Sequence, residues 1–235
     1  MNNNIINVLI ALVVLTGCSV SNKTGENNEK KKTVLKFQAG VNHGGIVENT
    51  NMNEVTDAGT PVSVDAFSGA TKTGVNAGVH IIYPVWRNHL ESGIDYMYNK
   101  NIFTFNDNLN NYMGKRELGV SQIMVPLTYN FGLLRKNNPD GLLQIKFGYV
   151  VQFNFVNVDD KGINLTDYSN NAFSGGITLG LSSAFFHLAN GDKLGLYFDM
   201  YRGSQIYKDF YNKDDFEMPG SSYFKTGLIY EFSFK

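Results

Sequence analysis

The segment 223–235, with the sequence YFKTGLIYEFSFK, alternates regularly between two kinds of side chain. One face carries Phe224, Thr226, Leu228, Tyr230, Phe232 and Phe234, and the other carries Tyr223, Lys225, Gly227, Ile229, Glu231 and Ser233. A period of two over this length is typical of a β-strand. Because the charges lie on one face and most large residues on the other, we expect this strand to close a barrel whose apolar face meets lipid.

The same alternation recurs in earlier segments, at about 34–46, 73–83, 89–105, 115–131, 143–155, 172–186 and 193–207. Each segment is long enough to cross a bilayer, which takes about 9–11 residues in a tilted strand. Long polar connections follow every second strand, and most of the others are short. This pattern predicts an all-β fold, an eight-stranded antiparallel up-and-down transmembrane β-barrel with both chain ends on one side.

Two details of the strand pattern are irregular. In the segment 115–131, Leu118 and Val120 share a face with each other but not with Ile123, Val125 and the apolar residues after them. We therefore predict a β-bulge near residues 121–122. The polar segments 47–72 and 156–171 are predicted to be loops.

The composition limits the class of protein. Of the 235 residues only 17% are charged, against about 25% in typical soluble domains. The formal net charge is −1, so no nucleic-acid partner is implied. There is a single cysteine, which excludes an intramolecular disulfide, and no apolar run reaches the roughly 18 residues of a transmembrane helix.

The N-terminal region predicts export. An apolar stretch at 5–17 has the length of a signal-peptide core, and the sequence LTGC at 15–18 resembles a bacterial lipobox. We expect a lipoprotein-type signal peptide at 1–17 with lipidation of Cys18, a polar tether at 18–32, and the barrel at 33–235. An ordinary secretory signal with an incidental cysteine is the alternative.

The charged residues of the strands predict what fills the barrel. They fall on the faces rich in Gly, Ser, Asn and Gln, and their signs nearly balance. We expect them to form an interior charge network of Lys36, Glu91, Asp95, Lys146, Asp199, Lys225 and Glu231. A soluble lipocalin-like cup, with the apolar faces inside, is the alternative architecture.

Aromatic residues gather near both ends of the predicted strands, as in membrane-interface belts. The lower belt is predicted to contain Tyr83, Trp86, Phe131, Phe185, Phe232 and Phe234. The upper belt is predicted to contain Phe103, Phe105, Phe153, Phe155, Phe173, Tyr207, Tyr223 and Phe224.

Two motifs carry a family resemblance, VPLTYNF at 125–131 and GLIYEFSF at 227–234. With the Gly-rich alternating strands, they resemble the small outer-membrane β-barrel domain family common in Bacteroidota. The resemblance covers about 33–235 and implies a Gram-negative outer-membrane location in the cell envelope. It implies no particular activity.

The sequence contains no motif for phosphate binding, zinc binding or a nucleophile elbow. We expect no catalytic residue, no cofactor and no metal, and a non-enzymatic, monomeric barrel whose long external loops serve interaction or envelope structure. Its predicted partners are outer-membrane lipid and a protein or glycan at those loops. The alternatives are a lipid-modifying barrel enzyme using a histidine such as His43, and the soluble ligand-binding barrel.

Overall fold

The computed structural model describes residues 33–46, 53–56, 59–64, 72–86, 88–133, 142–165, 171–205 and 220–233. All regular secondary structure in these ranges is β-strand: β1 (Val34–Ile46), β2 (Asn53–Val55), β3 (Pro61–Val64), β4 (Lys72–Val85), β5 (Asn88–Asn106), β6 (Tyr112–Leu133), β7 (Leu143–Lys161), β8 (Phe173–His187), β9 (Lys193–Gln205) and β10 (Gly220–Ser233). None of the described residues belongs to a helix long and apolar enough to cross a bilayer.

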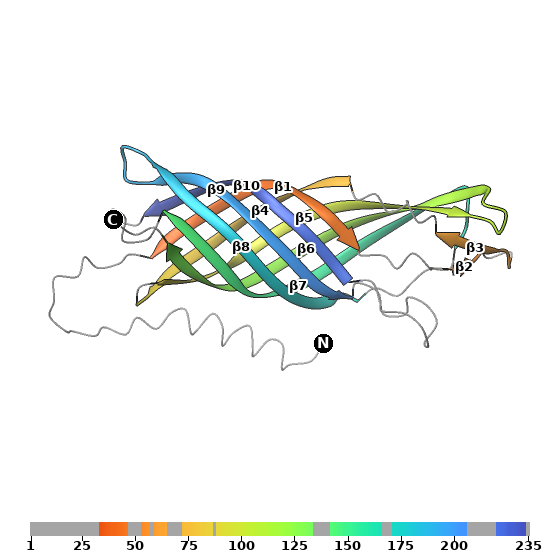
Figure 1. Cartoon of the computed structure of the whole chain (residues 1–235), viewed down its shortest axis with the longest axis horizontal. Coiled ribbons are helices and arrows are strands. Elements are labelled where there is room, and N and C mark those ends of the chain that lie inside the picture. The colour runs from red at the N-terminus through yellow and green to blue at the C-terminus, as the bar shows by residue number, and fades with distance from the viewer. Residues whose placement is uncertain are drawn as a thin grey trace. The chain divides into compact units, whose positions relative to one another are not determined.

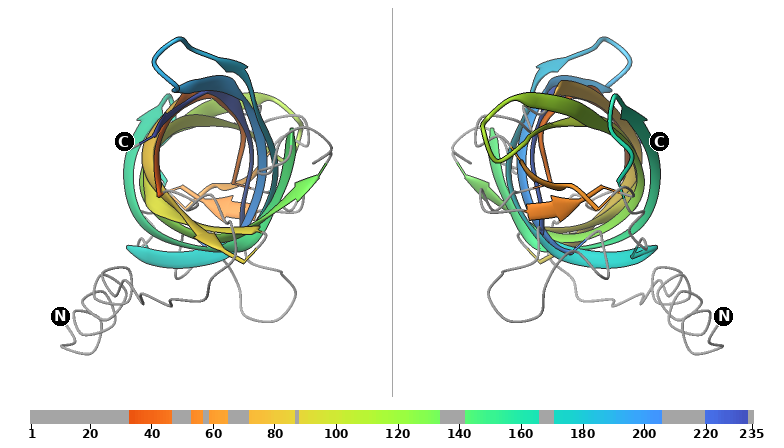
Figure 2. Two further views of the ribbon diagram at one scale, coloured as in Figure 1. Left: turned by 90° about the vertical axis from the view of Figure 1, so that its left-hand side faces the viewer. Right: turned by 90° about the vertical axis from the view of Figure 1, so that its right-hand side faces the viewer.

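Eight of these strands form a closed ring. The order is β5, β4, β1, β10, β9, β8, β7, β6, and β6 pairs back onto β5. All neighbours are antiparallel, and the first and last strands pair along their whole length, from Val34 opposite Ser233 to Ile46 opposite Ser221. Figure 1 shows the tilted strands from the side, and Figure 2 shows the ring along its axis. The predicted eight-stranded up-and-down barrel is therefore confirmed.

The two ends of the ring differ. At the end where β1 starts and β10 finishes, here called the terminal end, the β4–β5 and β8–β9 connections are short. At the opposite end β5, β6 and β7 stay paired with one another beyond the points where β4 and β8 stop pairing with them. The β4 pairing with β5 stops at Lys100 and the β8 pairing with β7 stops at Phe153, while β6 pairs with both as far as Asn106 and Lys161.

Glycines allow the close strand contacts that a narrow ring needs. Gly40 on β1 lies opposite Gly227 on β10. A Cβ atom built on Gly40 would lie 2.0 Å from the backbone oxygen of Thr226, well inside van der Waals contact. The side-chain-free residue is therefore required where β1 and β10 meet.

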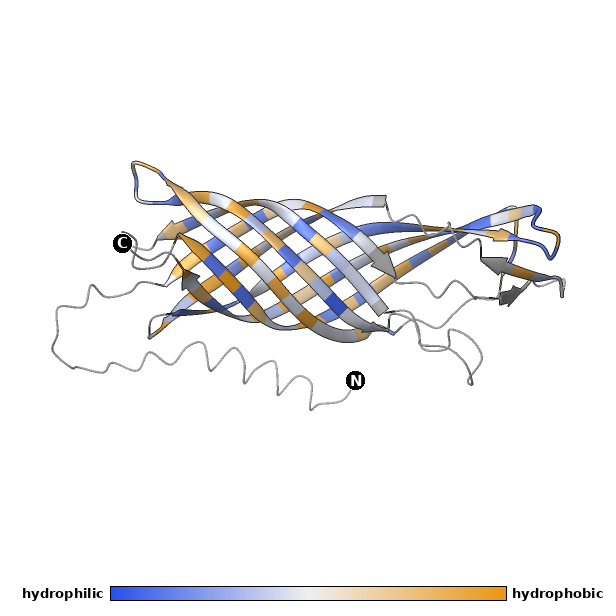
Figure 3. Ribbon diagram, in the orientation of Figure 1, coloured by the Kyte–Doolittle hydropathy of each residue, from blue (hydrophilic) through white to orange (hydrophobic). Residues whose placement is uncertain are grey.

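The outer surface of the ring is apolar. Phe147, Leu179 and Leu228 point outward and are 50%, 54% and 65% exposed. Residues at alternate positions on the same strands, such as Lys146 and Lys225, are buried inside the ring. Figure 3 shows this alternation of hydrophobic and hydrophilic residues along the strands. A soluble cup has the opposite distribution, so the ring has the surface of a transmembrane β-barrel.

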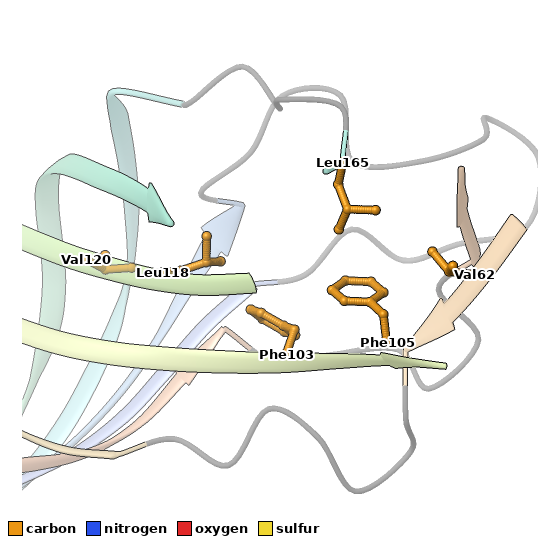
Figure 4. Close-up of a cluster of buried hydrophobic side chains, with 6 residues drawn as sticks. All are labelled: Val62, Phe103, Phe105, Leu118, Val120 and Leu165. Atoms are coloured by element: carbon orange, nitrogen blue, oxygen red, sulfur yellow. The ribbon is translucent and has the colours of Figure 1, made fainter. Parts of the chain in front are cut away.

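Beyond the ring, the inward side chains of the strands are apolar and the outward ones are polar, which is the reverse of the ring. We call residues 100–106 of β5, 112–120 of β6 and 156–161 of β7 the extension. Its inward side chains form an apolar cluster with β3 and the β7–β8 connection, and Figure 4 shows the six buried members: Val62, Phe103, Phe105, Leu118, Val120 and Leu165. Its outward side chains include Lys115, Glu117 and Lys161. An apolar inside and a charged outside are the arrangement of a sheet surrounded by water.

The predicted bulge at residues 121–122 is wrong. The register of β6 against β5 runs without a shift from Tyr96 opposite Ile123 to Thr104 opposite Lys115. The alternation never changes phase, and Leu118 and Val120 simply point inward, into the apolar cluster of the extension. The apolar residues of β6 therefore change from the outward face in the ring to the inward face in the extension, and this change looks like a shift of phase in the sequence.

Two predicted loops contain strands. The segment 47–72 includes β2 and β3, and the segment 156–171 includes the final residues of β7, up to Lys161. In the segment 47–72 the strands are too short for the alternation to stand out. In β7 the outward residues are polar because they belong to the extension.

The predicted aromatic belts are partly wrong. Phe103, Phe105 and Tyr223 are buried inside, at 3% exposure or less. The two phenylalanines belong to the apolar cluster of the extension, and Tyr223 lies on the inward face of β10, the face that carries Lys225. Other members do lie on the outer surface: Tyr83, Trp86, Phe131, Phe185 and Phe232 toward the terminal end, and Phe155, Phe173 and Phe224 toward the other. Phe153 is half-buried, and Tyr207 and Phe234 lie outside the described residues.

Candidate functional site

The interior of the ring contains ion pairs between strands. The Lys36 ammonium contacts the Glu91 carboxylate, which joins β1 to β5. Lys146 Nζ lies 2.7 Å from an Asp199 carboxylate oxygen, and Lys225 Nζ lies 3.1 Å from Asp95 Oδ2. Each pair connects strands that are far apart in sequence, and all six side chains are at most 6% exposed.

His80 lies between two of these pairs. Its Nδ1 atom is 2.5 Å from Glu91 Oε1 and its Nε2 atom is 2.8 Å from Asp95 Oδ1. Asn130 Nδ2 donates to the second oxygen of Glu91 at 2.6 Å, and Gln38 Nε2 donates to Asp95 at 2.7 Å. The carboxylates are thus surrounded by donors, as buried charges require.

The structure places all seven residues of the predicted interior charge network inside the ring, each at most 6% exposed: Lys36, Glu91, Asp95, Lys146, Asp199, Lys225 and Glu231. Glu231 lies directly opposite Lys36 in the β1–β10 register. The sequence reasoning missed His80 and Asn130 as partners of the carboxylates. For His80 a signal was available, since it shares the inward face of β4 with Asn76 and Gly78.

Two further layers fill the interior beyond the charges. The first is an apolar layer of Met97, Met124, Val150, Tyr201 and Tyr223, in which the two tyrosine rings stack with centroids 6.2 Å apart. The second is an amide layer, where Gln122 and Gln152 both donate to Asn154 Oδ1. An eight-stranded ring has an interior just wide enough for side chains, and these buried groups lie in it.

The extension has an inward ion pair of its own. Arg116 donates from Nε and Nη2 to the two oxygens of Asp160, both at 2.7 Å, and Nη2 also donates to the backbone oxygen of Leu165. This bidentate geometry is a strong form of the arginine–carboxylate contact. It holds Leu165, which follows β7, in the apolar cluster.

The outward face of the extension carries a group of charges that we call the lysine cluster: Lys100, Lys115, Glu117, Asp159 and Lys161. The Glu117 carboxylate contacts the ammonium groups of Lys100, Lys115 at 2.7 Å and Lys161 at 3.3 Å. Hydrogen bonds from Lys100 and then Lys115 hold the pKa of Glu117 at about 2, below the ordinary value of 4.5. Hydrogen bonds to Glu117 and Asp159 raise the pKa of Lys161.

The lowered pKa of Glu117 predicts an acid-sensitive extension. Because the folded protein binds this proton less tightly than the unfolded chain, the contribution of Glu117 to stability is present above about pH 4.5 and is lost as the pH falls toward 2. We expect Glu117→Gln to flatten the pH dependence of amide exchange in β6 over this window. The same profile in both proteins would contradict the assignment.

The remaining predicted site residues divide into two groups. Cys18, the predicted lipidation site, lies outside the described residues, as do the predicted signal peptide and tether. Of the histidines, His43 and His187 are exposed on the outer surface, while His80 and His89 are buried. Within the described ranges, no three His, Cys, Asp or Glu side chains are grouped so as to hold a metal ion.

The comparisons with known proteins give a distant likeness. No family model and no curated protein sequence matches the chain. The crystal structure of the outer membrane protein OprG from Pseudomonas aeruginosa is similar over 87% of this chain and 98% of that one, with 10% identity and a TM-score of 0.42. At this distance the barrel class rests on the strand order and the outer surface of the chain itself.

Proposed function

We propose that the chain is a non-enzymatic outer-membrane β-barrel protein with a filled interior. In this proposal the termini lie on the periplasmic side, the extension projects from the cell, and the long connections at that end contact other molecules or the envelope. One observation carries the proposal: apolar side chains cover the outside of a ring whose inside is charged. Only a hydrocarbon surrounding makes that arrangement favourable.

The filled interior favours a structural or interaction role over transport. Ion pairs, an apolar layer and an amide layer follow one another along the axis, and each layer uses side chains from several strands. Movement of a solute along the axis would require these contacts to break. The surfaces left for function are the connections at the extension end and the outward face of the extension.

The location is tested by expressing the full chain in a Gram-negative host and fractionating the cells. We expect the protein in the outer membrane, release only by detergent, and faster migration in unheated than in heated gel samples. Recovery in the soluble periplasmic fraction would overturn the proposal in favour of a soluble cup. The same preparation tests the absence of activity, since His43→Ala should leave the lipid composition of the host unchanged.

A further inference from the structure

The lysine cluster contains more positively charged than negatively charged side chains. Lys115 and Lys161 lie directly opposite each other on β6 and β7, and the next outward pair is Glu117 opposite Asp159. Like charges directly opposite each other are unfavourable in a sheet. The diagonal contacts with Glu117 relieve part of this cost, but among the described residues of the cluster three lysines face two carboxylates, which gives a net charge of +1.

The lysine side chains of the cluster remain accessible to solvent. The side chains of Lys100, Lys115 and Lys161 are 37%, 34% and 50% exposed, while that of Glu117 is 7% exposed. Glu117 therefore lies beneath the lysines and holds their ammonium groups together on the outer side. The cluster is organised before any anion binds, which lowers the entropic cost of binding one.

The position of the cluster relates it to the lipid surface. On β5, Lys100 comes two residues, or about 7 Å, after the exposed Tyr98. On β6, which runs in the opposite direction, Glu117 comes four residues before Ser121, the residue that pairs with Tyr98. With the strand tilt of about 35–45°, Glu117 lies about 10 Å beyond the level of Tyr98. The polar layer of a leaflet is about 5–8 Å thick, so the cluster meets its outer edge.

We propose that Lys100, Lys115 and Lys161 bind the phosphate-bearing headgroup of a lipid in the leaflet around the extension end. A phosphate offers several acceptor oxygens to the three ammonium groups and cancels the repulsion between Lys115 and Lys161. The lipid chains of such a molecule lie beside the apolar outer surface, next to Phe155 and Ile123. This inference rests on the proposed membrane location.

The test compares lipid retention by three proteins. The full chain, the variant K100Q/K115Q/K161Q and the control K30Q/K31Q/K32Q are reconstituted in phosphatidylcholine vesicles that contain phosphatidic acid. The two variants carry the same charge change, but the control alters a segment outside the barrel strands. After mild detergent extraction, bound phosphatidic acid is counted by native mass spectrometry.

We expect the full chain and the control to retain phosphatidic acid, and the cluster variant to bind it at least about tenfold more weakly, since the loss of even one charge-assisted contact is worth about that factor. Equal retention by all three proteins would overturn the inference. So would displacement of the lipid by inorganic phosphate at equal concentration, because the site would then take free phosphate. If the triple variant fails to fold, Lys161→Gln alone replaces it, with a smaller loss expected.

The two proposals fail in different ways. A chain that never enters the vesicles, or that leaves them without detergent, contradicts the membrane location. A chain that enters them and shows heat-modifiable migration, but retains phosphatidic acid regardless of the cluster, contradicts only the lipid site.

Discussion

Glu91→Leu is expected to lower the free energy of unfolding by about 3–5 kcal/mol, the cost of breaking a buried ion pair from one side. The substitution removes the carboxylate that contacts Lys36, His80 and Asn130. Lys36 would remain inside the ring, 1% exposed and without this partner. Urea unfolding in detergent micelles, followed by tryptophan fluorescence or gel migration, measures the loss.

A double variant separates the ion pair from simple packing. Lys36→Met together with Glu91→Leu removes both charges, and we expect it to be less destabilised than Glu91→Leu alone. Glu91→Gln keeps the size of the side chain and serves as the matched control for volume. A change below about 1 kcal/mol for Glu91→Leu would mean that the interior charges are solvated and do not act as a network.

Leu228→Arg is expected to destabilise the barrel by about 2–4 kcal/mol in a lipid bilayer, the cost of a cation on the lipid face near the midplane. Leu228 is 65% exposed and lies midway on β10 between the outward aromatic residues Phe224 and Phe232. In a soluble protein the same change at so exposed a position would cost less than about 0.5 kcal/mol. Unfolding in vesicles measures the difference.

The control for this change is Asn157→Arg. Asn157 is exposed on the outward face of β7, beyond the last apolar residue of that face, Phe155. We expect a change within about 0.5 kcal/mol there, because the extension is surrounded by water. Equal costs at Asn157 and Leu228 would contradict the polarity boundary that the structure places between ring and extension.

The ring could be predicted from the sequence because one physical rule governs it. Each strand has a lipid-facing and an inward-facing side, so the period of two appears directly in the residues, as in Lys36, Gln38 and Gly40 against Phe37 and Ala39. The inward position of the seven charged residues follows from the same rule. Which cation pairs with which anion depends on the stagger of neighbouring strands, so the alternation alone does not predict these ion pairs.

The extension could not be predicted in the same way, because the rule reverses there. Phe103 and Phe105 are inward residues of a water-exposed sheet, yet by pattern alone they look like members of an aromatic belt. The lysine cluster was missed for a related reason. Lys115 and Glu117 begin the predicted strand 115–131, whereas Lys161 lies in the predicted loop 156–171, and only the β6–β7 register brings them together.

The pairing of β1 with β10 has a consequence for the order of events in folding. These strands are far apart in the chain, and until they meet, β1 and β10 each present unpaired backbone groups. Such groups are costly in hydrocarbon, since no water is available there to replace the missing partner. We therefore expect crossing the membrane and closing the ring to be coupled, and the encounter of β1 with β10, which are far apart in the chain, to be a slow step of assembly.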